Sequence, residues 1–279
     1  MPHPARNRAA GLAAAVAAAV GIVTALSLVP AAGQSSPVSA ALVRAAELPP
    51  PLLPNLVVLP ATDIHVQRSS AGRMLRFETG LGNIGAGPME VRPNRARPCP
   101  PGQHNASQVM YRDRDRNGRY RPNIDTGLAT RPAGCMVFHQ SHDHWHFEAA
   151  SRYTLFLRDR PQASQVGTRK MSFCLRDSRR TPVRYGAPTN YPERYGACSK
   201  YSPQGISIGW VDVYQSFLAG QAIKLPPRLR DGLYCLQLRV DPRNTLRETD
   251  EEDNTSLRAF SMKGDRVIYR ATKFCRGVV

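Results

Sequence analysis

The chain reads YCLQLRV from Tyr234 to Val240, so that bulky apolar side chains alternate with smaller or polar ones. A period of two is typical of a β-strand that buries one face. Similar short runs lie at Tyr153–Leu157, Leu56–Leu59, Ile64–Val66 and Met74–Thr79, with Gly, Ser, Asn and Pro between them. No window predicts a long amphipathic helix, and the 24 prolines and 21 glycines fit a chain with many turns. The sequence therefore predicts an all-β fold: a β-sandwich core with long functional loops and little helix.

The N-terminal segment has the composition of an export signal. Arg6 and Arg8 precede an apolar run from Ala9 to about Pro30, and small residues follow it. The run is long enough for an uncleaved membrane anchor, but it is rich in Ala rather than Leu, which favours cleavage. We therefore expect a signal peptide at 1–32, a Pro-rich linker at 33–54 and one secreted, extracellular domain at 55–279.

Six cysteines in an exported chain predict three disulfides. Six cysteines allow fifteen pairings, and the sequence alone does not choose among them. No two are spaced as CxxC, which argues against a thiolate metal site. Our hypothesis is that nearest neighbours pair, as Cys99–Cys135, Cys174–Cys198 and Cys235–Cys275.

The chain carries a formal net charge of +17. A surface of this kind favours anionic partners such as cell-wall or surface polymers, acidic proteins or membrane surfaces. A solvated basic surface without a specific partner is an equal alternative. We expect no nucleic acid partner, because no basic stripe is interleaved with aromatic residues.

Four of the seven histidines lie in the stretch HQSHDHWH, at His139, His142, His144 and His146. On a strand His142 and His146 would stand about 13 Å apart, and on a helix His144 would point away from both. A bent strand or an irregular loop is therefore needed if the last three are to reach one ion. Three imidazoles suit Cu(II) or a catalytic zinc equally well. The alternative is a polar loop without a metal.

Two acidic segments could hold a hard cation. Asp113, Asp115 and Asn117 begin like an EF-hand loop, but Ile124 stands where the bidentate Glu would be, so an ion and a polar turn both stay open. Five carboxylates and the amide of Asn254 lie between residues 248 and 254. That loop is either solvated or a calcium site.

Taken together, these segments resemble the catalytic domain of the lysyl oxidase family from about Asn55 to Met262. The histidine stretch resembles the family's copper-binding segment, KMSFCL from Lys170 resembles the segment with the cofactor lysine, and the segment from Gln204 to Tyr214 resembles the one with the cofactor tyrosine. The spacing of Glu248, Asp250, Asp253 and Asn254 resembles that of the family's calcium-binding loop. Asn55 and Leu56 stand where the family supplies further calcium oxygens.

The resemblance implies a copper-dependent amine oxidase. His142, His144 and His146 would bind copper, while His139 would be a further ligand or support one. A Lys170–Tyr214 cross-link would form the lysine tyrosylquinone cofactor. The substrate would be a primary amine or a lysyl side chain, oxidised by O2 to an aldehyde with release of H2O2 and NH3.

Asp212 lies two residues before Tyr214 and would face the same side of a strand, which makes it a candidate base or orienting group. A structural role for Asp212 is an equal alternative.

The chain departs from the family in several places. Ser141, Arg180 and Trp210 stand where animal members have cysteines, so the disulfides must differ, and Asn55 replaces an aspartate of the calcium site. A cationic protein would also repel cationic peptides at long range. The competing hypothesis is a non-catalytic secreted β-sandwich that binds copper and calcium. A zinc hydrolase ranks last, because no HExxH base is present.

Overall fold

The computed structural model describes residues 47–94, 99–159 and 165–277, without the side chains of Ala149, Gln165, Thr168 and Lys170. The predicted signal peptide lies outside the described residues, as does most of the predicted linker. Residues Leu48–Val279 form a compact unit. Within the described residues, no helix has the length and hydrophobicity that a membrane crossing requires.

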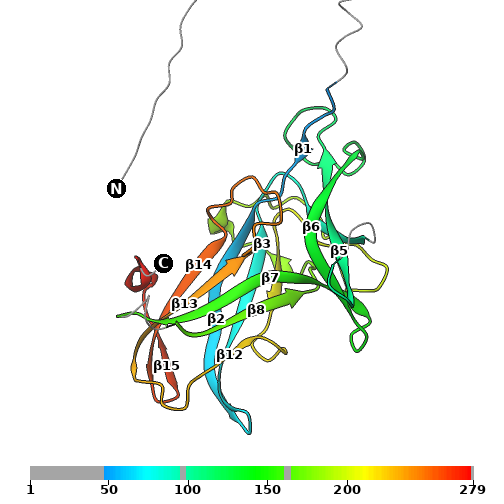
Figure 1. The fold of residues 1–279 in the computed structure, drawn as a ribbon. Helices are drawn as coiled ribbons and strands as arrows, with labels where there is room; N and C mark the ends of the chain where they lie inside the picture. The colour runs from blue at the N-terminus through cyan, green and yellow to red at the C-terminus, as the bar shows by residue number, and fades with distance from the viewer. Residues whose placement is uncertain (1–46, 95–98, 160–164, 278–279) are drawn as a thin grey trace, which may run out of the picture. The chain divides into compact units, whose positions relative to one another are not determined.

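The regular secondary structure of the described residues is almost entirely antiparallel β-sheet (Figure 1), which confirms the predicted all-β fold. The first sheet has ten strands: β1 (Pro51–Leu52), β4 (Met89–Asn94), β5 (Gln103–Arg112), β6 (Leu128–His139), β7 (His144–Leu157), β8 (Gln165–Phe173), β10 (Gln204–Ile206), β13 (Gly232–Val240), β14 (Thr255–Lys263) and β15 (Arg266–Tyr269). The main order is β10-β4-β5-β6-β7-β13-β14-β15, with β8 paired to β7 and β1 to β5.

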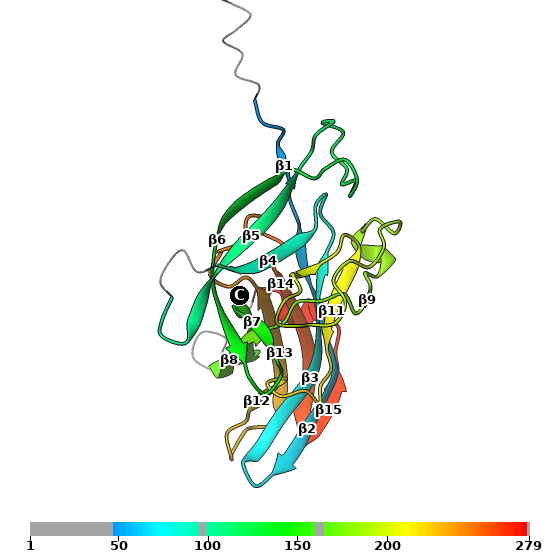
Figure 2. The same cartoon turned by 90° about the vertical axis from the view of Figure 1, so that its right-hand side faces the viewer.

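The second sheet has five strands: β2 (Leu56–Ser69), β3 (Gly72–Asn83), β9 (Arg179–Arg180), β11 (Trp210–Tyr214) and β12 (Ala222–Lys224). Its order is β12-β3-β11-β9, with β2 paired to β3, and Figure 2 shows β3, β11 and β9 together. The helical residues among those described are two 3₁₀ turns, η1 (Val183–Tyr185) and η2 (Thr272–Cys275).

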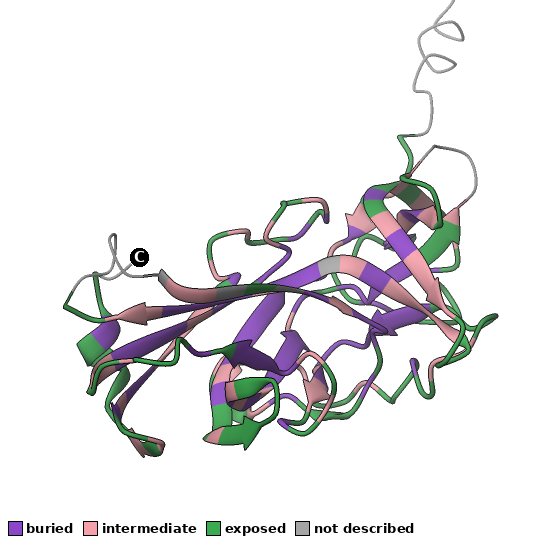
Figure 3. Ribbon diagram, turned by 60° about the horizontal axis from the view of Figure 1, so that its bottom comes forward, coloured by how far each residue is buried: buried purple, intermediate pink, exposed green. Residues whose placement is uncertain are grey.

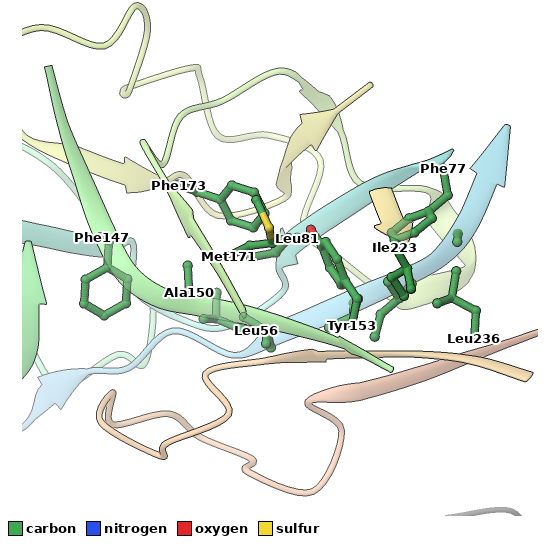
Figure 4. Packing of buried hydrophobic residues seen from close by; sticks show 14 of the residues in the cluster. Leu56, Phe77, Leu81, Phe147, Ala150, Tyr153, Met171, Phe173, Ile223 and Leu236 are labelled. Atoms are coloured by element: carbon green, nitrogen blue, oxygen red, sulfur yellow. The ribbon is translucent and has the colours of Figure 1, made fainter. Parts of the chain in front are cut away.

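The main hydrophobic core lies between the two sheets, where the buried colour of Figure 3 is concentrated. Phe77 of β3 and Tyr153 of β7 meet edge to face with ring centroids 5.0 Å apart. Ile223 of β12 and Leu236 of β13 belong to the same cluster (Figure 4). The alternation of Tyr234–Val240 arises here, because its apolar positions face this core.

All three disulfides join nearest neighbours in the sequence, as the hypothesis expected. They are Cys99–Cys135, Cys174–Cys198 and Cys235–Cys275, and no described cysteine is free. Cys174–Cys198 ties the end of β8 to the long segment that leads to β10. This segment forms part of the candidate site.

Candidate functional site

The histidines lie on a β-hairpin formed by β6 and β7. His139 ends β6 and faces His144 at the start of β7, and the backbone N–H of His142 donates to the His139 carbonyl at 3.1 Å. Asp143 has a left-handed φ of 53°, which lets the chain reverse between them. The turn supplies His142 and the strand supplies His144 and His146. This combination of turn and strand brings together rings that neither element alone would join.

The ring nitrogens of His142, His144 and His146 lie close to one another. The Nε2 atoms of His144 and His146 are 3.0 Å apart, and Nδ1 of His142 is 3.4 Å from Nε2 of His146. Two nitrogens bound to one ion at about 2 Å lie about 3 Å apart, so this donor set fits copper or zinc. The His139 ring centroid lies 4.1 Å from that of His146, which places His139 beside the group.

Burial keeps two of these imidazoles neutral. Burial and the neighbouring His139, His144 and His142 lower the pKa of His146 to about 3. Burial, followed by His142, also lowers the pKa of His144. A neutral imidazole is the form that binds a metal, so His144 and His146 are ready to bind one at neutral pH.

The hairpin faces a cavity of about 670 Å³ that both sheets line. The first sheet supplies the histidines and the end of β8. The second sheet supplies Asp212 and Tyr214 of β11. Arg176 and the Cys174–Cys198 disulfide also line the cavity. Residues far apart in the sequence therefore share one cavity.

Tyr214 is held in place by its neighbours. Its hydroxyl donates to the Cys174 carbonyl at 2.6 Å, and its ring lies 3.9 Å from that of Phe173. On β3 its register partner is Thr79. Burial, followed by the charge of Asp212, raises the pKa of the Tyr214 phenol well above its usual value.

Asp212 is the carboxylate that lines this cavity among the described residues. Its side chain is buried, and Oδ2 has no hydrogen-bond partner within the described structure. Burial raises the pKa of Asp212 well above its usual value, against the opposing hydrogen bond from the Arg176 backbone and the Arg176 charge. A buried carboxyl with a free oxygen can exchange a proton with a bound molecule.

Lys170 lies on β8 opposite Arg152 of β7. Its side chain lies outside the described residues. Ser172 and Phe173, which follow it on the same strand, line the cavity. The structure thus places the strand of Lys170 at the cavity.

The six residues of the predicted calcium site lie together where the 241–254 segment meets the start of β2. The Leu56 N–H donates to Oε2 of Glu248 at 2.6 Å, and the Asn55 amide donates to Oδ2 of Asp253 at 3.0 Å. The Asn254 amide donates to Oε1 of Glu248 at 3.1 Å, and the Asp250 N–H donates to Oδ1 of Asn55 at 3.1 Å.

Several features of this group fit a hard cation. Oδ1 of Asp253 and Oδ1 of Asn254 are buried and have no hydrogen-bond partner in the described parts of the chain. Burial raises the pKa of Glu248 to about 8, so its carboxylate is costly without a compensating positive charge. The donor set is all oxygen, which calcium prefers.

Two further carboxylates join the calcium group. Asp241, Glu248 and Glu251 each place an oxygen within 4.8 Å of the others. Glu251 belongs to the acidic run, but its offset did not match the family site, and Asp241 follows directly after β13. An acidic residue at the end of a strand next to an acidic loop is the signal that could have identified Asp241.

The Asp113 loop is held by its own hydrogen bonds. Asp113 accepts the backbone N–H groups of Asn117 and Gly118, and Asp115 pairs with Arg121. Asp125, one position after Ile124, completes a group of three carboxylates with oxygens within 4.8 Å. Its two oxygens accept the N–H groups of residues 114 and 121. These contacts explain the loop as a polar turn, and an ion there stays a hypothesis.

Comparison with known proteins gives one consistent result. The lysyl oxidase family matches residues 124–272, more than half of the chain. Lysyl oxidase homolog 4 of Homo sapiens is 29% identical over 132 residues, or 47% of this chain and 16% of that protein. Lysyl oxidase homolog 2 of Xenopus tropicalis is 28% identical over 132 residues, with the same shares. The alignment thus spans about a sixth of the relatives' length, while the family match includes the histidine hairpin, β8, β11 and the 248–254 loop.

Proposed function

Because this chain belongs to the lysyl oxidase family, we propose that it is a copper-dependent amine oxidase that acts on lysyl side chains or other primary amines. The reaction converts RCH2NH2, O2 and H2O to RCHO, NH3 and H2O2. The observation that carries the proposal is the single cavity that joins three imidazoles to Tyr214 and Asp212.

In this proposal His142, His144 and His146 hold the copper ion, and Lys170 and Tyr214 form the lysine tyrosylquinone. Copper and the quinone, when bound, supply the electron sink for the amine and pass the electrons to O2. The Cys174 carbonyl and the Phe173 ring orient the Tyr214 side chain for this role. His139, whose ring lies against that of His146, supports that ligand from the side.

Asp212 acts as the general base in this proposal. Its free Oδ2 accepts the proton that leaves the α-carbon of the substrate. Burial raises the pKa of Asp212, and a carboxylate with a raised pKa is a stronger proton acceptor than an ordinary one. The same proton can later return to the leaving product.

We also assign a structural calcium ion to Asn55, Leu56, Glu248, Asp250, Asp253 and Asn254. The segment from 241 to 254 connects β13 and β14 of the first sheet, while Leu56 begins β2 of the second sheet and Asn55 directly precedes it. An ion there would join the two sheets and neutralise the buried Glu248 carboxylate.

The chain would act outside the cell, after removal of a signal peptide at 1–32. A linker at 33–54 would then precede a catalytic domain at 55–279. The net charge of +17 would favour anionic cell-wall or surface polymers as partners. The three disulfides agree with an oxidising compartment.

Mass spectrometry of the copper-loaded protein tests the proposal. We expect a covalent peptide pair joined through Lys170 and Tyr214, together with peroxide release when amines are added. Lys170→Ala should abolish both, whereas Lys263→Ala, a change at an exposed lysine on β14, should leave both intact. Unmodified Lys170 and Tyr214 with no oxygen uptake would leave the non-catalytic copper- and calcium-binding module.

A further inference from the structure

The candidate cavity has an uneven balance of charge. Among the described residues that line it, Asp212 is the carboxylate and Arg176 is the permanently charged cation. Asp212 is buried, and Arg176 is exposed at the cavity wall. Bound copper would add further positive charge at the three histidines. The accessible part of the cavity therefore presents positive charge.

The backbone around Arg176 is fixed. Leu175 and Asp177 on either side are both buried. The Asp177 carboxylate accepts the N–H groups of Arg194, Tyr195 and Ser207 at 2.9, 3.0 and 2.7 Å, and the Ser207 hydroxyl at 2.6 Å. Arg176 thus extends from a rigid base rather than from a loose loop.

The guanidinium of Arg176 is unpaired. It makes no hydrogen bond or ion pair with any other residue that the structure describes, unlike Arg73 and Arg92, which pair with Asp265 and Glu90. Its charge nevertheless acts inside the cavity, because it lowers the pKa values of Asp212 and Tyr214 against the larger effect of burial. An anchored, unpaired guanidinium at a cavity wall is a ready partner for a carboxylate.

We propose that Arg176 binds a carboxylate on the distal part of the amine substrate, so that the site selects amines that carry an anionic group. This inference rests on the oxidase function proposed above and names its substrate class. The carboxylate can belong to an ω-amino acid or to an acidic residue next to a lysine. Diamines, and lysines flanked by basic residues, are poor substrates because their second cation meets Arg176 and the positive surface.

The first test compares three amines of equal chain length: 6-aminohexanoate, hexylamine and 1,6-diaminohexane. We expect kcat/KM for 6-aminohexanoate to exceed that for hexylamine about tenfold, since a charge-assisted hydrogen bond contributes about 1.5 kcal/mol. Arg176→Gln should bring this ratio close to one, and Arg176→Glu should reverse the preference towards the diamine. Arg184→Gln removes the same charge from an exposed arginine outside the cavity and should leave the ratio unchanged.

Two peptides identify the source of the carboxylate. A lysine peptide with a neighbouring Glu should be oxidised faster than its Gln counterpart if a flanking residue supplies the anion. Equal rates for the two peptides, with the preference for 6-aminohexanoate retained, assign the site to free amino acids. Equal rates together with no preference for 6-aminohexanoate overturn the inference.

Binding without turnover separates this inference from the oxidase itself. In the Lys170→Ala background, calorimetry should show hexanoate binding about tenfold more tightly than 1-hexanol, with the difference lost in Arg176→Gln. That result supports the anion site even if no amine is oxidised. If hexanoate binds no better than 1-hexanol, or if Arg176→Gln and Arg184→Gln behave alike, Arg176 is not the anchor, and amine oxidation can still stand.

Discussion

Removal of one disulfide at a time gives a sharp test of how the candidate site is held. Cys174–Cys198 closes a separation of 24 residues at the cavity wall, and Cys235–Cys275 closes one of 40 residues in a separate cluster with Ala259. The loop-entropy relation gives about 3.5 kcal/mol for the first bridge and about 4 kcal/mol for the second. Double replacement by alanine should therefore destabilise the two variants almost equally, as measured by urea unfolding.

The two variants should differ at the cavity. The Cys174 carbonyl accepts the Tyr214 hydroxyl at 2.6 Å, so a loose Cys174 costs this hydrogen bond, about 1 kcal/mol. In protein prepared without copper, where Tyr214 is unmodified, we expect Tyr214 to become more reactive towards nitration in the Cys174→Ala/Cys198→Ala variant. In the Cys235→Ala/Cys275→Ala variant, whose bridge is remote from the cavity, its reactivity should stay at the level of the parent protein.

The reasoning fails if both variants protect Tyr214 equally, because the disulfide would then not position the ring. It also fails if loss of the Cys174–Cys198 bridge leaves the free energy of unfolding unchanged. Measurements at a urea concentration where each variant is fully folded keep global unfolding out of the nitration result.

Three further predictions concern single groups. In EDTA the free energy of unfolding should fall as the pH rises from 4.5 towards 8, and the loss at pH 7 should be about 3 kcal/mol. The reason is that Glu248, with a pKa of about 8, stays protonated in the folded protein at pH values where the unfolded chain has already lost this proton. Calcium or Glu248→Gln should flatten this slope in urea titrations. Asp212→Asn should retain copper binding but lower kcat for oxygen uptake about 10²- to 10⁴-fold, and a smaller loss argues for a structural role. Tyr153→Phe removes a buried hydroxyl bonded to Thr79 and Gln221 and should cost about 1 to 2 kcal/mol in urea unfolding, whereas no loss would mean that this bridge does not matter.

The sequence was a good guide wherever a local pattern decides the structure. Tyr234–Val240 lies within β13, and its apolar positions Tyr234, Leu236, Leu238 and Val240 are all buried. The alternation was readable because one face of this strand meets the core. Cys235 is buried as well, since its disulfide fills a second small cluster on the other face.

The features of the site that depend on pairing between distant segments could not be predicted from local sequence patterns. Nothing local to His142 indicates that β6 and β7 form a hairpin or that His139 pairs with His144. Asp125 completes a carboxylate group that an EF-hand spacing places one residue earlier. In the sequence Arg176 looks like an ordinary surface charge. Only the structure shows that its side chain lines the cavity and that its guanidinium has no partner among the described residues.

The candidate site lies where the two sheets meet, so the packing between the sheets should affect both the stability of the fold and the geometry of the site. The histidine hairpin belongs to the first sheet and Tyr214 to the second, so their separation depends on how the sheets pack. Tyr153 on β7 bonds to Thr79, and Thr79 is the register partner of Tyr214. A change in the Tyr153–Thr79 hydrogen bond should therefore shift Tyr214 through its pairing with Thr79. Tightly packed cores transmit small shifts. Substitutions in the core between the sheets should therefore change the geometry of the site even where the substituted residue does not contact it.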